Sequence, residues 1–243
     1  MPAKWHKYSY SAQRDERRSL LSIFGVFLLL GIVFFVIHVN LFAMIEIHTS
    51  VLEPTLSERD RIIATPLYNG SNKNTIIPLI SPKRGDLAVI SPAYPHELPL
   101  PLAVLDSAVA FLSLQRYHPF LSSDVQAEKS LVRRIVGLPG DAIYLDKGVL
   151  HIRPANAAHF LTEFELAERD YEVIIQNLPK TWTNDLPFSG SFTEITLSDS
   201  EYFVMNDNRS LYADSRIWGP ISADRIQSKV LFRYWPFDRF GQP

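Results

Sequence analysis

Apolar residues are concentrated near the start of the chain. From Ser19 to Ile45 the sequence contains no Asp, Glu, Lys or Arg. About 20 apolar residues cross the hydrocarbon core of a bilayer as a helix, so we predict a single transmembrane helix over residues 19–41. The apolar core is longer than that of a removable signal peptide, and bulky residues follow it, so we interpret it as a retained anchor. A buried helix of a soluble protein is the alternative.

Charged residues flanking this segment predict its orientation. Positive residues next to a membrane span stay on the cytoplasmic side. Residues 1–18 are therefore predicted to form a cytoplasmic tail, and residues 42–243 an extracytoplasmic domain. The predicted location is the inner (cytoplasmic) membrane, with the lipid bilayer contacted through one helix. The basic residues before the segment are Lys4, Lys7, Arg14, Arg17 and Arg18.

Beyond residue 42 the pattern changes to short alternating runs, which are typical of strands. Turn signals such as Lys83-Arg84-Gly85-Asp86 separate them. The sequence therefore predicts a mainly β, antiparallel domain, interrupted by insertions at 93–129 and 153–200 and with a short helix near Thr162 to Arg169. A second apolar run, Ala103 to Leu114, is too short to span a membrane and is expected to be a core helix or to rest on the membrane surface. The predicted strands are Arg61–Ala64, Asp86–Ile90, Arg133–Val136, Ala142–Leu145, Val149–Ile152, Tyr202–Met205 and Lys229–Arg233.

Composition excludes several classes of function. The formal net charge is −2, so no basic field favours nucleic acid as a partner. The chain contains no cysteine, which excludes disulfides and thiolate metal sites. His, Asp and Glu do not cluster at ligand spacing. We expect neither a metal nor a cofactor.

Four segments, taken together, resemble the bacterial type I signal peptidase family. Their order, their spacing and the preceding apolar segment make the joint match specific, although each segment alone is a weak signal. The resemblance covers about half of the chain, and both insertions lie outside it. The segments are His48–Leu56 (HTSVLEPTL), Pro82–Ile90 (PKRGDLAVI), Val132–Ile143 (VRRIVGLPGDAI) and Asn206–Pro220 (NDNRSLYADSRIWGP).

The resemblance implies a membrane-bound serine endopeptidase that removes signal peptides from exported precursors. In such enzymes a serine hydroxyl attacks the peptide carbonyl and a neutral lysine accepts its proton. Burial makes a neutral lysine possible, because desolvation lowers its pKa. A nearby hydroxyl stabilises the oxyanion.

This chain departs from the family at the positions that carry this chemistry. The nucleophile position holds Val51, which has no group that can attack. The base position holds Arg133, whose guanidinium keeps its proton in proteins. The serine that positions the lysine in the family is replaced by Tyr212.

Other site positions match the family. Thr49 occupies the oxyanion position, and Asp214 and Arg216 occupy the positions of a supporting ion pair. The resemblance also places Asp141 in a supporting turn, and Leu52 and Val132 beside the substrate groove. For these matching residues, a structural role in holding loops together is favoured over a surviving catalytic role.

We therefore expect a catalytically defective signal peptidase-like protein that binds secretory precursors or other exported proteins in the peptidase groove. The alternative is an active signal peptidase that uses displaced residues, with Ser50 as nucleophile and Lys129 as the nearest lysine. A shift by one residue on an extended segment turns a side chain to the opposite face, which disfavours Ser50.

Overall fold

The computed structural model describes residues 17–31, 42–66, 81–91, 98–113, 117, 119–120, 131–175, 183 and 189–243. The chain divides into two units, residues 1–41 and residues 42–243. In the first unit, residues 17–31 are helical. Among the described residues, no helix combines the length and apolarity needed to cross a membrane. Residues 32–41, the second half of the predicted span, lie outside the described residues.

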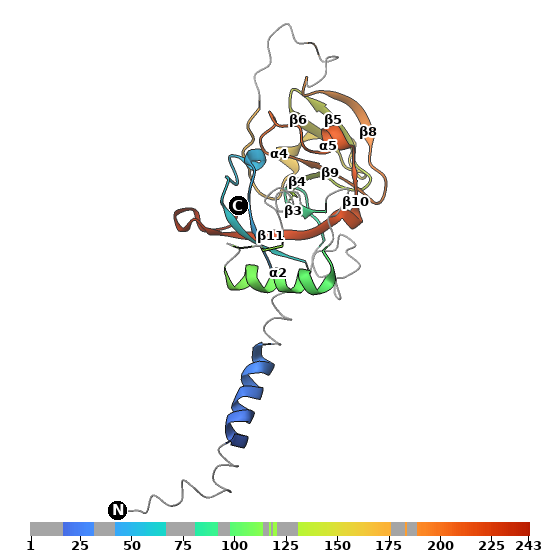
Figure 1. Ribbon diagram of the computed structural model, residues 1–243. Helices are drawn as coiled ribbons and strands as arrows, with labels where there is room; N and C mark the ends of the chain where they lie inside the picture. Colours follow the sequence, from blue (N-terminus) through green and yellow to red (C-terminus); the bar gives the residue numbers. More distant parts are fainter. Residues whose placement is uncertain are drawn as a thin grey trace, which may run out of the picture. The chain divides into compact units, whose positions relative to one another are not determined.

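A seven-stranded antiparallel sheet forms the base of the second unit. Its strand order is β1-β2-β11-β3-β4-β9-β10, so strands distant in sequence are neighbours. The long strand β11 joins the N-terminal strands to β3 (Figure 1). The strands are β1 (Ala43–Glu46), β2 (Arg61–Thr65), β3 (Leu87–Ile90), β4 (Leu131–Gly137), β9 (Glu201–Met205), β10 (Ile221–Ser222) and β11 (Ile226–Trp235).

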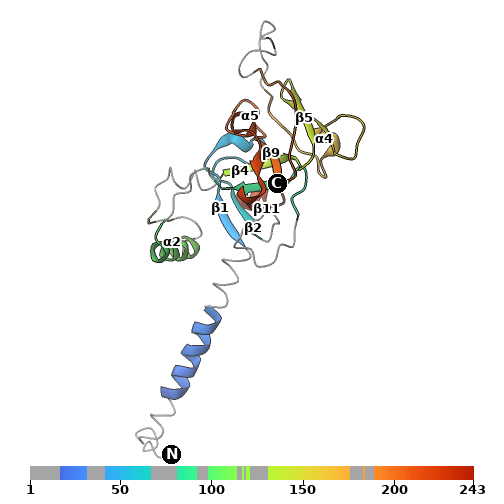
Figure 2. The same cartoon turned by 90° about the vertical axis from the view of Figure 1, so that its right-hand side faces the viewer.

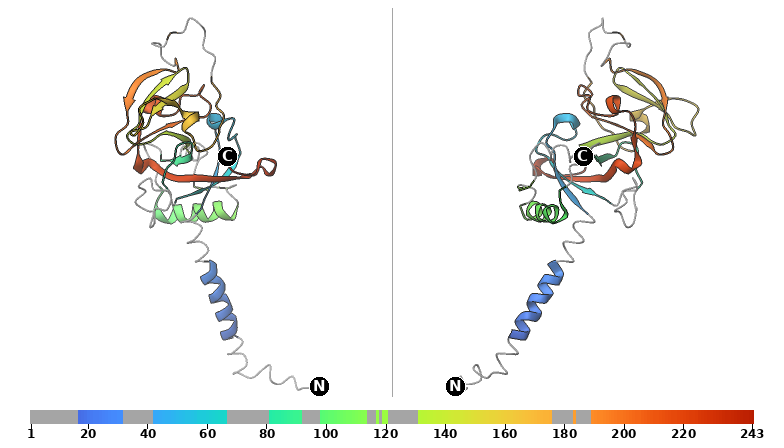
Figure 3. Two further views of the ribbon diagram at one scale, coloured as in Figure 1. Left: turned by 180° about the vertical axis from the view of Figure 1, so that it is seen from behind. Right: turned by 45° about the vertical axis from the view of Figure 1, so that its right-hand side comes forward.

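A second, four-stranded sheet has the order β7-β6-β5-β8. Figure 2 shows β5 and the short helix α4 to one side of β4, β9 and β11, and Figure 3 shows the same separation from two further directions. Its outer strands come from the 153–200 insertion, which therefore extends the β structure. The strands are β5 (Ala142–Asp146), β6 (Val149–Arg153), β7 (Leu161–Thr162) and β8 (Phe192–Thr196).

Short helices connect these strands. The predicted helix near Thr162 is α4 (Glu163–Leu166), and it begins with a capping box between the side chains and backbone of Thr162 and Glu165. The second apolar run is helix α2 (Leu100–Leu112), in which Asp106 is buried and Leu105 is exposed. The others are η2 (Ser50–Leu52), α5 (Ser215–Trp218), η3 (Ala223–Arg225) and η4 (Phe237–Arg239).

All seven predicted strands are present, and the expectation of a mainly β, antiparallel domain is confirmed. Two glycines of the Gly-x-Pro-Gly-Asp segment fix the connection between the sheets. A Cβ on Gly137 would approach the side chains of Leu197 and Phe203 to 2.8 Å. Gly140 has φ +81°, which favours glycine. Side chains larger than hydrogen at Gly137 would thus separate β4 from β9.

Candidate functional site

Strand β4 carries two consecutive arginines in a fully buried stretch, Arg133 and Arg134, each 3% exposed. Successive side chains of a strand point to opposite faces of the sheet. Arg134 shares a face with Val132, whose apolar cluster contains Val51 and Leu52. On the opposite face, which Arg133 shares with Ile135, the apolar residues belong to a different cluster. The two guanidinium groups therefore have separate surroundings.

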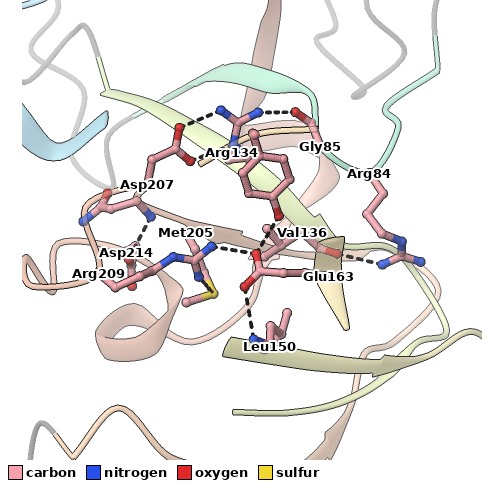
Figure 4. Close-up of polar contacts among 12 residues, drawn as sticks. Arg84, Gly85, Arg134, Val136, Leu150, Glu163, Met205, Asp207, Arg209 and Asp214 are labelled. Carbon is pink, nitrogen blue, oxygen red and sulfur yellow. Dashed lines mark hydrogen bonds and ion pairs between the residues drawn. The ribbon is translucent and has the colours of Figure 1, made fainter. Parts of the chain in front are cut away.

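Arg134 has a complete set of partners. Its Nε and Nη2 donate to the two carboxylate oxygens of Asp207, at 2.7 and 2.6 Å (Figure 4). Its Nη1 donates to the carbonyl of Gly85 at 2.6 Å, and its guanidinium carbon lies 4.1 Å from the ring centroid of Tyr171. The hydroxyl of Thr55 donates to the same carboxylate at 2.6 Å. The bidentate pair and these further contacts connect all four family-like segments.

The turn after β4 has its own ion pair. Arg84 donates through Nη1 to Asp141 Oδ2 and to the carbonyl of Val136, both at 2.7 Å. The backbone N–H of Leu138 also donates to Asp141, at 2.7 Å. Asp141 thus closes the turn and joins it to the segment before β3. This contact gives a structural basis for the supporting position expected of Asp141.

A third buried pair involves the 153–200 insertion. Glu163 is completely buried and accepts from Arg209 Nη2 at 2.6 Å, from the Tyr171 hydroxyl at 2.6 Å and from the backbone N–H of Leu150 at 3.1 Å (Figure 4). Burial, together with the Glu163 carboxylate, raises the pKa of the Tyr171 phenol. The hydroxyl therefore stays protonated and donates.

Arg133 is held differently. Its Nε donates to the carbonyl of Ala213 at 2.8 Å and its Nη1 to the carbonyl of Val132 at 2.7 Å. The ring of Trp218 lies 5.5 Å from the guanidinium carbon. Burial lowers the pKa of Arg133 to about 10, and the nearby Asp214 carboxylate opposes this shift. Arg133 is consequently still a cation at neutral pH.

The Asp214 carboxylate is engaged elsewhere. Arg216 donates to it through Nε at 2.9 Å and through Nη2 at 2.7 Å, and the backbone N–H of Asn206 donates at 2.9 Å. The Arg216 guanidinium also covers the ring of Tyr212, 4.3 Å from its centroid. The pair expected from the sequence is therefore formed. It caps the start of α5, and Tyr212 packs against it.

The candidate nucleophile region lies on η2. Val51 is buried, and its carbonyl accepts from the N–H of Asn208 at 3.0 Å. Thr49 is exposed, and its side chain does not cap η2. Ser50 is half-buried, and its hydroxyl makes no hydrogen bond to a described residue.

The groove positions expected at Leu52 and Val132 are occupied by core side chains. Each is 1% exposed, and both belong to the cluster that contains Val51. Their contact with a substrate stays a prediction.

A cavity of about 590 Å³ lies on the Arg134 side of β4. Thr55, Arg134 and Tyr171 line it, together with Lys229 and Asp86, which form an ion pair at 2.6 Å. Val51 and Arg133 do not line it. The cavity is therefore distinct from the positions that carry the chemistry of the family.

The assignment of Val51 and Arg133 to substituted positions stays a prediction, and sequence reasoning missed the ion-pair partners. Arg84, Arg134 and Asp207 lie within the matched segments, and the alternation along β4 could have separated Arg134 from Arg133. No local signal pairs Glu163 with Arg209. Chemically, neither Val51 nor Arg133 can supply a nucleophile or a neutral amine.

Comparisons with known proteins agree with the motifs. The model of the family described as signal peptidase, peptidase S26, matches residues 19–235. The chain is similar to signal peptidase IB of Staphylococcus aureus, with 29% identity over 109 residues, which is 45% of this chain and 55% of the relative. It is also similar to signal peptidase I of Streptococcus pneumoniae, with 24% identity over 152 residues, or 55% of this chain and 74% of the relative. The match thus spans about half the length of the staphylococcal relative.

Proposed function

Because the chain belongs to the S26 signal peptidase family, we propose that it acts in the processing of secretory precursors as a binding protein that does not cut. The proposal rests on the motif match, which assigns Val51 and Arg133 to the positions where the family has its serine and lysine. Valine cannot attack a carbonyl. A guanidinium held by two backbone carbonyls cannot accept a proton at neutral pH.

The retained ion pairs support a groove that still binds. Arg134 with Asp207 and Arg84 with Asp141 join family-like segments around β4, and Arg216 with Asp214 holds the fourth segment internally. Buried pairs of this kind hold loops in one arrangement when their hydrogen bonds are complete. The ligand that fits is an exported precursor or another secretory partner, bound as an extended peptide.

Photo-crosslinking tests this proposal. A photoreactive amino acid would replace Thr49, which is exposed next to η2, in the full-length chain in detergent. Glu194, exposed on β8 of the second sheet, is the matched control position. We expect a precursor with its signal peptide to crosslink from position 49, and the mature protein alone not to. Absence of the crosslink, or equal crosslinking from position 194, would refute binding at this groove.

The proposal includes the membrane anchor over residues 19–41, with residues 1–18 in the cytoplasm. The chain lacks cysteine, so single-cysteine variants can be labelled without background. In intact spheroplasts an impermeant maleimide should label Ser198→Cys and should not label Ser9→Cys. The opposite pattern would reverse the proposed orientation.

An active peptidase is the second candidate, and Ser50 is the observation that favours it. Ser50 adjoins the nucleophile position and is half-buried rather than closed off. Activity would require a base, and no described residue accepts a hydrogen bond from its hydroxyl. Cleavage of a precursor that is lost in Ser50→Ala would establish this candidate in place of the first.

A further inference from the structure

Four arginines of the described chain are buried, and one of them differs from the rest. Three hold a carboxylate at 2.6–2.7 Å. Arg133, with an exposed fraction of 3%, has no ion pair with any described residue. Burying a cation without a counter-ion costs several kcal/mol. The three paired arginines are Arg84 with Asp141, Arg134 with Asp207, and Arg209 with Glu163.

Part of the Arg133 guanidinium is unused. Nε and Nη1 each donate to a backbone carbonyl, while Nη2 donates to no described atom. Within the described chain, the side-chain atoms that are sealed from solvent without a partner are Asn206 Oδ1, Arg209 Nε and Tyr234 OH. Arg133 Nη2 is not among them. This nitrogen is therefore reached from outside the protein.

The nearest acid cannot neutralise Arg133. Both oxygens of Asp214 already accept from Arg216, and Oδ2 also accepts from the N–H of Asn206. The side chain packed next to the Arg133 guanidinium is apolar and partly exposed, since the Trp218 ring lies 5.5 Å away and Trp218 is 39% exposed. A ligand at this position would meet a cation at its base and an apolar side chain at its edge.

We propose that Arg133 forms a carboxylate-binding site, in which Nη2 donates to a carboxylate of a bound peptide. The site rests on the proposed function, because the peptide is the ligand of the groove. A planar guanidinium with a free N–H edge matches a carboxylate better than a neutral carbonyl. The carboxylate has two possible sources, the C-terminus of a peptide that has already been cut or an Asp or Glu side chain.

Fluorescent peptides distinguish these sources in binding to the full-length chain in detergent. One peptide contains an apolar stretch and ends in Ala-x-Ala with a free carboxylate. A second is identical but ends in a carboxamide. A third ends in a carboxamide and carries one Asp near that end. We expect the free acid to bind about tenfold or more tightly than the carboxamide, as for a hydrogen bond to a charged group.

Variants assign the preference to Arg133. In Arg133→Met the acid and carboxamide should bind equally, and in Arg133→Lys the preference should be smaller than in the natural chain. Arg153→Met is the matched control, because Arg153 also lies over an aromatic ring, that of Phe160, but is paired with Glu194 at the surface. It should keep the full preference.

The outcomes separate the two proposals. If neither the free acid nor the Asp peptide binds more tightly than the plain carboxamide, or if a preference survives in Arg133→Met, the carboxylate site is refuted while peptide binding itself stands. Tight binding of the Asp peptide would assign the carboxylate to a side chain. If no peptide binds, the site can still be tested with a small carboxylate. The thermal unfolding temperature of the chain would be compared in sodium acetate and in sodium chloride of equal ionic strength. A stabilisation specific to acetate that is absent in Arg133→Met would uphold the site without the groove function, and its absence would refute both.

Discussion

Arg133 and Arg134 are neighbours in sequence, equally buried, and opposite in their surroundings. Arg134 makes a bidentate pair with Asp207 and further contacts with Gly85 and Tyr171. Arg133 makes two hydrogen bonds to backbone carbonyls and faces Trp218. Arg134 thus belongs to the scaffold, whereas Arg133 is the residue that the motifs assign to the position of the family's catalytic base.

The difference between the two arginines shows that the buried ion pairs of the domain do not involve the positions that the motifs assign to the reactive residues. The ion pairs within and between the family-like segments use Arg84, Arg134 and Arg216, and none of them includes Val51 or Arg133. Substitution of Val51 or Arg133 therefore leaves these pairs in place. Unfolding measurements on single variants can test this contrast.

Loss of Arg134 should have the largest effect on stability. Arg134→Met leaves the fully buried Asp207 carboxylate without its cation, which costs about 3–5 kcal/mol of unfolding free energy. Urea unfolding in detergent, followed by tryptophan fluorescence, measures this loss. Arg153→Met, which removes a surface pair, is the control and should change stability by less than about 1 kcal/mol. If the two variants lost the same unfolding free energy, Arg134 would not be a residue on which the scaffold depends.

Asp141→Asn should have a smaller effect. The amide keeps the shape of the turn but weakens the charged contacts with Arg84 and with the N–H of Leu138. We expect a loss of about 2 kcal/mol in the same unfolding measurement. Glu194→Gln, at the exposed partner of Arg153, is the matched control. If Asp141→Asn were as stable as that control, the turn would not need its ion pair.

The capping box of α4 should contribute less again, and in a pH-dependent way. Thr162→Ala removes the cap and should cost about 1 kcal/mol at neutral pH. Backbone and side-chain hydrogen bonds from Thr162 lower the pKa of Glu165 below its ordinary value of 4.5. A lowered carboxylate pKa gives stability above the unfolded value that is lost as pH falls through the folded value.

The stability gap between the natural chain and Thr162→Ala should therefore narrow as the pH falls from about 7 to about 3. Unfolding curves at several pH values provide the test. A constant gap across this range would mean that the Thr162 hydroxyl does not stabilise the Glu165 carboxylate.

Arg133→Met should have the smallest effect, within about 1 kcal/mol of the natural chain. Two hydrogen bonds to carbonyls are lost, but a buried cation without a counter-ion is removed at the same time. Urea unfolding beside Arg134→Met gives the comparison directly. A loss as large as that of Arg134→Met would place Arg133 in the scaffold and remove the contrast between the two arginines.

Much of the domain could be predicted from local patterns. Alternation located the strands, and the spacing around Pro54 and Gly137 located Val51 and Arg133. The ion pairs could not be predicted in the same way, because Glu163 lies on α4 and Arg209 in the loop after β9, and only the tertiary fold brings them together. The contact of Trp218 with Arg133 likewise depends on how the short helix α5 is seated. Local sequence identifies a charged residue but not the partner that neutralises it.

Cleavage of a precursor tests most directly whether this groove binds without cutting. Purified full-length chain in detergent would be incubated with a precursor that has a small-residue cleavage site, beside Ser50→Ala and an active signal peptidase. We predict that the natural chain leaves the precursor intact, as Ser50→Ala does, while the active enzyme removes the signal peptide. Cleavage by the natural chain that disappears in Ser50→Ala would contradict this and show that a displaced serine has taken over the reaction.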